Sequence, residues 1–172
     1  MSERLDIKRG SELELKIESL SYGGKGVAHY NDFVVFVKNA IPGQTVKAMV
    51  YRKKPGYAEA RSLDIIHESS KAVDAPCGHF GVCGGCKVQN LDYSEQIIEK
   101  TRQVEDSFDR LGGFSGFKLD KIVPADPIFN YRNKMEFTFS SNRWILKNES
   151  VDKGSLFALG RHIPGRYDKI LD

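Results

Sequence analysis

The 172-residue sequence lacks the features that would direct it to a membrane or out of the cell. It has no apolar run long enough to cross a bilayer. Its first residues, MSERLDIKRG, are polar and lack the apolar core of a secretory signal. It also has no internal repeats and no low-complexity tracts. We therefore expect a globular, cytoplasmic protein with no membrane partner.

Cysteine is scarce, and all three cysteines lie in the stretch CGHFGVCGGCKVQN, as Cys77, Cys83 and Cys86. Because disulfides are rare in the cytosol, clustered thiols there indicate metal or redox chemistry. A zinc ribbon would need a second Cys-x-x-Cys or a His pair, and His79 is too close to Cys77 for a comfortable tetrahedral site. The spacing favours an iron–sulfur cluster, with zinc, plain thiols or a disulfide as open alternatives.

Gly84 and Gly85 fill the gap between the last two cysteines. Since glycine has no Cβ, the backbone there can wrap closely around a metal site and direct N–H groups at sulfur. Such hydrogen bonds tune the reduction potential of an iron–sulfur cluster.

The positive charge of the chain is unevenly distributed. The formal net charge is +3, and the whole excess falls within residues 1–66, because residues 67–172 are balanced. A mildly basic module can attract a polyanion such as a nucleic acid. The alternative is a surface that is charged only for solvation.

Residues 12–66 have the pattern of short strands separated by turns. In ELELKIESL, apolar and polar residues alternate, with Leu13, Leu15 and Ile17 on one face. The stretch FVVFV (33–37) is continuously apolar and suits a strand buried on both faces. Strands this short and this closely spaced predict a small closed β-barrel, with a sheet sandwich as the alternative.

A helix is predicted from Asp92 to Leu111. Asp92 can cap it, with Glu95 as the partner in a capping box, and Gly112-Gly113 end it. Apolar side chains recur along one face of this helix at Ile97, Thr101, Val104, Phe108 and Leu111.

Beyond the helix, YRNKMEFTFS (131–140) alternates like a strand, and SLFALGRH and GRYDKILD indicate further strands. The last residues, DKILD, resemble a strand interrupted in mid-element, so we expect a longer natural chain. The predicted fold class is mainly β. Four regions are predicted: a barrel (1–67), a linker with the cysteine loop (68–91), a helix (92–113) and a partial α+β central domain (114–172).

Several of these stretches resemble one known family. The segments CGHFGVCGGCKVQNLDYSEQIIEKTRQV, YRNKMEF and LGRHIPGRYDKILD are similar to RNA uracil-5-methyltransferases of the RumA type. Those enzymes methylate carbon 5 of a uridine in 23S ribosomal RNA. The segment SLSYGGKGVAHYNDFVVFVKNAIPGQTVKAMV resembles their TRAM domain, an RNA-binding barrel of the oligonucleotide-binding type. The resemblance covers nearly the whole chain in the same order.

The resemblance implies that important parts of the enzyme lie beyond Asp172. In the family a fourth cysteine follows the segment that matches GRYDKILD. It would complete a 4Fe-4S cluster with Cys77, Cys83 and Cys86, and the cluster would have a structural role. The S-adenosylmethionine site and the catalytic residues lie further on, and the helix docks on that catalytic domain. The resemblance therefore implies no catalytic residue within this chain, which alone should be inactive and should hold its helix loosely.

The family's chemistry is nucleophilic catalysis. A cysteine thiolate adds to carbon 6 of uracil, which makes carbon 5 reactive toward the methyl group of S-adenosylmethionine. A carboxylate then removes the proton from carbon 5, and the target base must leave its stack to reach the site. A cluster ligand is not free to act as this nucleophile, which excludes the three cysteines present.

Candidate RNA contacts combine aromatic rings, which stack on bases, with cations, which bind phosphate. Two candidates flank the glycine turn (residues 22 and 25) near His29, three form a basic run at a strand end (residues 52–54), and two lie on one face of a later strand (residues 132 and 134). For each, ordinary solvated surface is the alternative. The candidates are Tyr22, Lys25, Arg52, Lys53, Lys54, Arg132 and Lys134.

The expected partner is ribosomal RNA, and the expected state is a monomer. Two other functions stay open. One is a free-standing RNA-binding module with a zinc or thiol knuckle, and the other is a tRNA uridine-5-methyltransferase. His79 and His162 are expected to be structural or surface residues.

Overall fold

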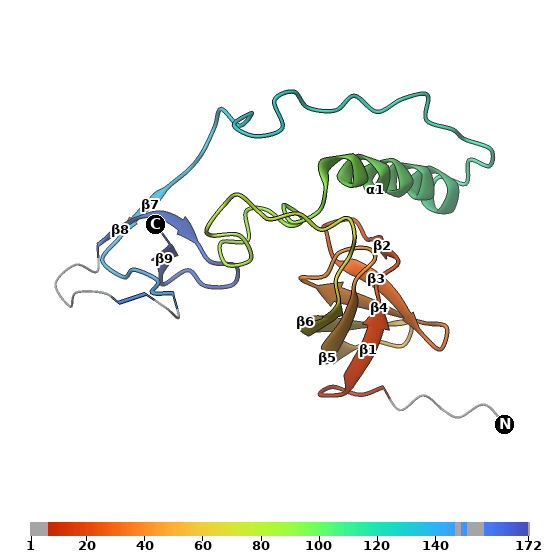
Figure 1. Cartoon of the computed structure of the whole chain (residues 1–172), viewed down its shortest axis with the longest axis horizontal. Coiled ribbons are helices and arrows are strands. Elements are labelled where there is room, and N and C mark those ends of the chain that lie inside the picture. The colour runs from red at the N-terminus through yellow and green to blue at the C-terminus, as the bar shows by residue number, and fades with distance from the viewer. Residues whose placement is uncertain (1–6, 147–148, 151–156, 172) are drawn as a thin grey trace. The chain divides into compact units, whose positions relative to one another are not determined.

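The computed structural model describes residues 7–146, 149–150 and 157–171, and its chain divides into two compact units (Figure 1). The first unit comprises Met1–Ala75 with Lys87–Pro124, and the second comprises Pro76–Cys86 with Ala125–Asp172. The structure thus groups the cysteine loop with the C-terminal residues and the long helix with the barrel. Among the described residues, no helix is both long and apolar enough to span a membrane.

The first unit is built on a six-stranded mixed sheet. Neighbouring strands in the order β1-β5-β6-β4-β3-β2 are antiparallel, except for the parallel pair β4 and β6. The strands are β1 (Glu12–Lys16), β2 (Ser19–Leu20), β3 (Gly26–Tyr30), β4 (Phe33–Lys38), β5 (Thr45–Lys53) and β6 (Tyr57–His67).

One bent segment closes this sheet into a barrel. β1 and β2 follow each other directly, yet β1 pairs with β5 and β2 pairs with β3, at opposite ends of the sheet. At the bend, the Ile17 N–H donates to the Gln44 carbonyl and the Glu18 N–H donates to the Val27 carbonyl, both at 2.8 Å. The predicted barrel is confirmed.

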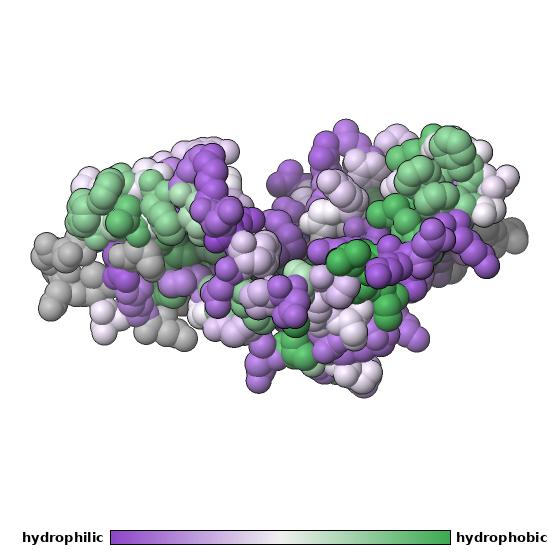
Figure 2. Space-filling view, turned by 90° about the horizontal axis from the view of Figure 1, so that it is seen from above, coloured by the Kyte–Doolittle hydropathy of each residue, from purple (hydrophilic) through white to green (hydrophobic). Residues whose placement is uncertain are grey.

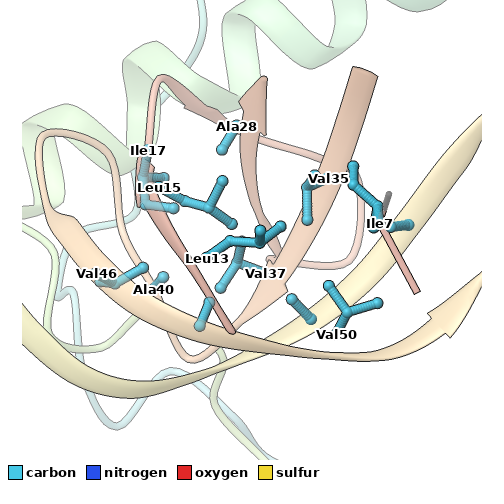
Figure 3. Packing of buried hydrophobic residues seen from close by; sticks show 13 residues of the cluster. Ile7, Leu13, Leu15, Ile17, Ala28, Val35, Val37, Ala40, Val46 and Val50 are labelled. Atoms are coloured by element: carbon cyan, nitrogen blue, oxygen red, sulfur yellow. The ribbon is translucent and has the colours of Figure 1, made fainter. Parts of the chain in front are cut away.

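The alternation of apolar and polar residues in the sequence determines which side chains form the barrel core. Leu13, Leu15 and Ile17 point inward, as their period of two requires (Figure 3). In β4, Val35 and Val37 are fully buried, whereas Phe33, Val34 and Phe36 are half-buried and Lys38 is exposed. The apolar run 33–37 therefore has one buried face, and its other face contributes to the outside of the barrel. The core cluster contains Ile7, Leu13, Leu15, Ile17, Ala28, Val35, Val37, Ala40, Val46, Ala48, Val50, Ala58 and Ala60.

The predicted helix is confirmed, with Asp92 as its N-cap. The predicted capping box with Glu95 is not formed, because the Asp92 N–H donates to the Lys71 carbonyl and Glu95 pairs with the Lys71 ammonium. α1 (Tyr93–Asp106) begins after Asp92, whose carboxylate accepts a hydrogen bond from the Ser94 N–H at 2.9 Å. The hydrogen bonds from Ser94 lower the pKa of Asp92. A π-helical turn, η1 (Ser107–Leu111), continues the helix until Gly113, whose φ of 69° ends it.

Polar side chains attach α1 to the barrel. The Glu99 side chain is buried, and its Oε2 accepts the Leu20 N–H at 2.6 Å. The Gln103 amide donates to the Leu20 carbonyl at 3.1 Å and to the Ser21 carbonyl at 3.3 Å. The expectation of a loosely held helix was therefore wrong, because it considered the apolar face of the helix and overlooked these polar contacts with β2.

The apolar face of the helix is largely exposed. Phe108 stacks on Phe117 with ring centroids 4.3 Å apart, and Phe114 lies 5.9 Å from Phe108. Even so, Phe108 is 41% exposed and Leu111 is 88% exposed. Figure 2 shows hydrophobic side chains gathered where α1 and η1 end.

The second unit contains a small antiparallel sheet, β7-β8-β9, of Thr138–Ser140, Ala158–His162 and Ile170–Leu171. Ala158, Ile170 and Leu171 are its buried apolar residues among those described. The strand predicted over 131–140 is confined to its last three residues. The apolar side chains of this segment remain exposed, because no described apolar surface packs against them.

Glu99 offers a test of the attachment between α1 and β2. Glu99→Ala removes the acceptor of the Leu20 N–H, and an unsatisfied buried donor costs about 1–3 kcal/mol in free energy of unfolding. Glu99→Gln keeps an acceptor oxygen and should cost much less. Urea unfolding followed by circular dichroism measures both variants, and equal stability of the two would contradict this role for Glu99.

Candidate nucleic-acid interface and cysteine loop

Two of the candidate RNA-contacting cations meet at one carboxylate on the barrel. Lys25, in the turn between β2 and β3, places its Nζ 2.5 Å from Glu59 Oε1. Arg52, near the end of β5, places its Nη1 3.5 Å from Glu59 Oε2. Arg52 and Glu59 are also register partners, across a bulge in β5 between Val50 and Arg52. The strand pairing and the turn thus bring together cations that lie far apart in the sequence.

The pair of Lys25 and Glu59 is fully ionised at neutral pH. The hydrogen bond to Glu59 raises the pKa of Lys25, and the same bond lowers the pKa of Glu59. Glu59 has a side chain that is 13% exposed, whereas Lys25 is 32% exposed and Arg52 54%. The cations therefore face solvent over a mostly covered carboxylate, and this trio carries one net positive charge.

Aromatic rings lie beside these charges. Phe36 is the register partner of Glu59, and its ring packs edge-on against Tyr57 with centroids 5.6 Å apart. Tyr22 is 94% exposed in the turn that also holds Lys25. An exposed ring beside cations is what single-stranded RNA binding needs. His29 instead lies 3.0 Å from a Glu18 carboxylate oxygen.

The remaining candidates divide between the two units. Lys53 ends β5, and Lys54 follows it with its backbone N–H donating to the Tyr57 carbonyl at 2.8 Å; both side chains are exposed. Arg132 and Lys134 belong to the second unit, outside its strands. Lys134 pairs with Glu136 at 2.9 Å, with both side chains largely exposed.

The cysteine loop is tightly folded. The Phe80 N–H donates to the Cys77 carbonyl at 3.0 Å, and the Cys83 N–H donates to the His79 carbonyl at 3.1 Å. Gly84 has a φ of +67°, and a Cβ there would overlap the ring of Pro164. The loop therefore packs closely on the segment after β8.

One backbone N–H of the loop is directed at a cysteine sulfur. The Gly85 N–H donates to Cys83 Sγ at 3.3 Å, as predicted for a glycine beside a metal-binding sulfur. No disulfide joins the cysteines, and Cys77 and Cys83 are half-buried while Cys86 is exposed. Cysteine sulfur is the donor atom that iron–sulfur centres use. However, among the described residues no three Cys, His, Asp or Glu side chains converge closely enough to hold a metal ion.

Two histidine nitrogens in this unit are also notable. Nδ1 of His79 and Nδ1 of His162 are buried and have no hydrogen-bond partner among the described atoms. The ring of His162 lies 5.9 Å from that of Tyr167. The expected structural role of both histidines stays a prediction.

The sequence of the barrel matches a known domain family. The TRAM domain family matches residues 7–63, which hold β1 to β5 and most of β6. Residues 7–63 form a TRAM domain. The cations Lys25 and Arg52 and the carboxylate of Glu59 all lie on this TRAM domain.

The similarity extends beyond the TRAM domain. An uncharacterized RNA methyltransferase of Bacteroides thetaiotaomicron is 45% identical over 152 residues, which are 86% of this chain and 33% of that protein. One from Porphyromonas gingivalis is 37% identical over 92% of this chain and 35% of its own length. The 23S rRNA (uracil(1939)-C(5))-methyltransferase RlmD of Chromobacterium violaceum is 37% identical over 78% of this chain and 26% of its own length. The chain thus spans about a third of the length of these relatives.

Sequence reasoning missed two residues that shape these sites. Glu59 was not singled out, although it joins Lys25 to Arg52. Arg161 was also overlooked, although a Cβ at Gly85 would lie only 3.1 Å from its Nη1. Both belong to alternating strands, where nothing in the local pattern distinguishes a structural charge from a solvated one.

A pair of glycine variants tests the packing of the cysteine loop. Gly84→Ala and Gly81→Ala both place alanine at a positive φ, of 67° and 81°. Only at Gly84 would the new Cβ also meet a neighbour, Pro164. Gly84→Ala should therefore speed amide hydrogen exchange in residues 76–86 and 158–162 more than Gly81→Ala does. The same effect from both variants would contradict the packing.

Proposed function

We propose that this chain is the N-terminal, RNA-binding part of an S-adenosylmethionine-dependent methyltransferase that methylates carbon 5 of a uridine in 23S ribosomal RNA. The observation that carries the proposal is the extent of the similarity. The three RNA methyltransferases named above match over 78–92% of the chain, whereas the TRAM domain alone covers residues 7–63. A TRAM domain attached to an unrelated protein would match over the barrel only.

RNA binding is the part of this function that the described residues can perform. Lys25 and Arg52 offer cations to phosphate, and Tyr22 offers a ring on which a base can stack. Lys53 and Lys54 extend the cationic surface at the end of β5. Glu59 holds Lys25 and Arg52 in place, so less side-chain entropy is lost when they bind RNA.

The chemical step belongs to the part of the relatives that this chain does not span. S-adenosylmethionine would supply the methyl group there. The residues present here bind the RNA and orient it toward that active site. We accordingly expect no methyl transfer by the 172-residue chain alone.

The cysteine loop is proposed as a structural iron–sulfur site. Cys77, Cys83 and Cys86 would provide three thiolates to a 4Fe-4S cluster, and a fourth ligand would come from outside this chain. The Gly85 N–H, already directed at Cys83 sulfur, would stabilise the thiolate. When bound, such a cluster would cross-link the loop to a distant part of the chain.

The exposed apolar side chains at the end of the helix fit a partner within the longer protein. Phe108, Leu111 and Phe114 are each more than a third exposed, and the relatives are about three times as long as this chain. We propose that the remainder of the methyltransferase covers this surface.

The proposal is tested with the whole protein encoded by the gene for this chain. Purified without oxygen, it should transfer labelled methyl from S-adenosylmethionine to 23S rRNA, and mapping should place the label on carbon 5 of one uridine. The 172-residue chain, in parallel, should bind a single-stranded rRNA fragment in a filter-binding assay without methylating it. Methylation of tRNA and not of 23S rRNA would contradict the substrate, and absence of RNA binding would contradict the role of this chain.

The metal proposal has its own measurement. The anaerobically purified longer protein should contain iron and acid-labile sulfide in equal amounts, near four of each per chain. Cys83→Ser should lower both. Stoichiometric zinc without iron would overturn the iron–sulfur assignment.

A further inference from the structure

A cavity on the outer face of the TRAM domain gathers three cations. It has a volume of about 460 Å³ and is lined by Arg9, Gly10, Lys38, Met49, Val50, Tyr51 and Arg61. None of these residues is among the RNA-contacting candidates predicted from the sequence. We propose that this cavity binds a phosphate group of the RNA backbone, as a second anchoring point beside Lys25 and Arg52. This inference rests on the proposed RNA-binding function.

Local backbone structure brings the three cations together. Lys38 at the end of β4 is the direct register partner of Arg61 in β6, and Arg61 is also the partner of Met49 in β5. Arg9 reaches the same place because a turn at Gly10, with φ of 92°, hydrogen-bonds to β5. There the Gly10 N–H donates to the Val50 carbonyl at 2.8 Å.

The charges in this cavity are not balanced within the described residues. Lys25, Arg52 and Lys47 each lie within salt-bridge distance of a carboxylate. No described carboxylate lies within such a distance of Arg9, Lys38 or Arg61. Like charges directly opposite each other on neighbouring strands are destabilising. An anion in the cavity would remove that cost, and Arg side chains with a Lys are well suited to phosphate.

The ring of Tyr51 holds the Lys38 ammonium group in position. Lys38 Nζ lies 4.9 Å from the centre of the Tyr51 ring, a cation–π contact. Tyr51 lies at the β5 bulge between Val50 and Arg52, and bulges redirect side chains. The ammonium is thus held over the cavity without a carboxylate that would compete with phosphate.

The cavity continues the surface already proposed to bind RNA. Lys38 and Arg61 lie two residues beyond Phe36 and Glu59 on the same faces of β4 and β6. Two residues along a strand span about 6.6 Å. A strand of RNA whose phosphate contacts Lys25 and Arg52 can therefore place another phosphate in the cavity while crossing β4, β6 and β5.

The first experiment tests the cavity with inorganic phosphate, independently of RNA. Thermal unfolding of the 172-residue chain is measured in chloride and in phosphate at equal ionic strength. The midpoint should rise with phosphate concentration, because phosphate bound to the folded chain stabilises it. The double variant Lys38→Gln/Arg61→Gln should show a clearly smaller rise, while its midpoint in chloride stays the same or increases, because a like-charge contact is removed.

A matched control separates the cavity from general charge. Neither Lys16 on β1 nor Lys47 on β5 lines the cavity, and the double variant Lys16→Gln/Lys47→Gln removes the same number of positive charges from the barrel. It should keep the wild-type rise of the midpoint with phosphate. The same loss in both double variants, or an unchanged response in Lys38→Gln/Arg61→Gln, would overturn the proposed site.

The second experiment uses a single-stranded rRNA oligonucleotide. Losing the one phosphate contact made in the cavity should weaken binding and reduce the slope of log K against log salt by about 0.7, the value for each phosphate neutralised in single strands. The control double variant should change the slope by clearly less. If wild-type chain binds phosphate but no RNA, the proposed function fails and the site is a free-phosphate site. If it binds RNA and both double variants have equal slopes, the cavity is not an anchor for RNA.

Discussion

The closure of the TRAM barrel is the constraint on which the rest of the first unit depends. One segment, bent at Ile17 and Glu18, pairs with β5 on one side and with β3 on the other. That closure places the turn holding Lys25 above the strand that carries Glu59. It also fixes β2, whose Leu20 N–H and carbonyl receive the side chains of α1. The candidate RNA surface and the docking of the helix are therefore consequences of one backbone arrangement.

Charge on the barrel is organised by what each cation contacts. Lys25 and Arg52 share Glu59, which fixes their positions but cancels part of their charge. Lys38 is placed by the ring of Tyr51, which leaves its charge uncompensated. A surface that binds a polyanion benefits from both arrangements. Cations held in position fix where the polyanion lies on the surface, and uncompensated cations attract it.

The barrel and the helix could be predicted because their signals are local. The alternation around Leu13 and Leu15 gave the buried face of β1, and Asp92 with Gly113 gave the ends of the helix. The pairing of Lys25 with Glu59 was not predictable, because it depends on strand order and on a bulge in β5. The same holds for the cavity, where register places Lys38 beside Arg61.

The segment 131–140 shows that a regular local pattern is not sufficient to form a strand. Its alternation is as regular as that of β1, yet Phe137 is 55% exposed and only the last three residues form a strand. Alternation predicts a strand only where another surface covers its apolar face. The cysteine loop is similar, because its spacing indicates a metal site while the described side chains do not converge on one. Both features fit a chain that is similar to a third of a longer protein.

RNA binding by the outer face of β4, β5 and β6 can be measured residue by residue. The ¹⁵N-labelled chain is titrated with a single-stranded rRNA fragment, and the amide chemical shifts are followed. We expect shifts at residues 21–25, 36–38, 49–54 and 57–61, which weaken with added salt. Shifts confined to β1, or to α1 with none on this face, would contradict it.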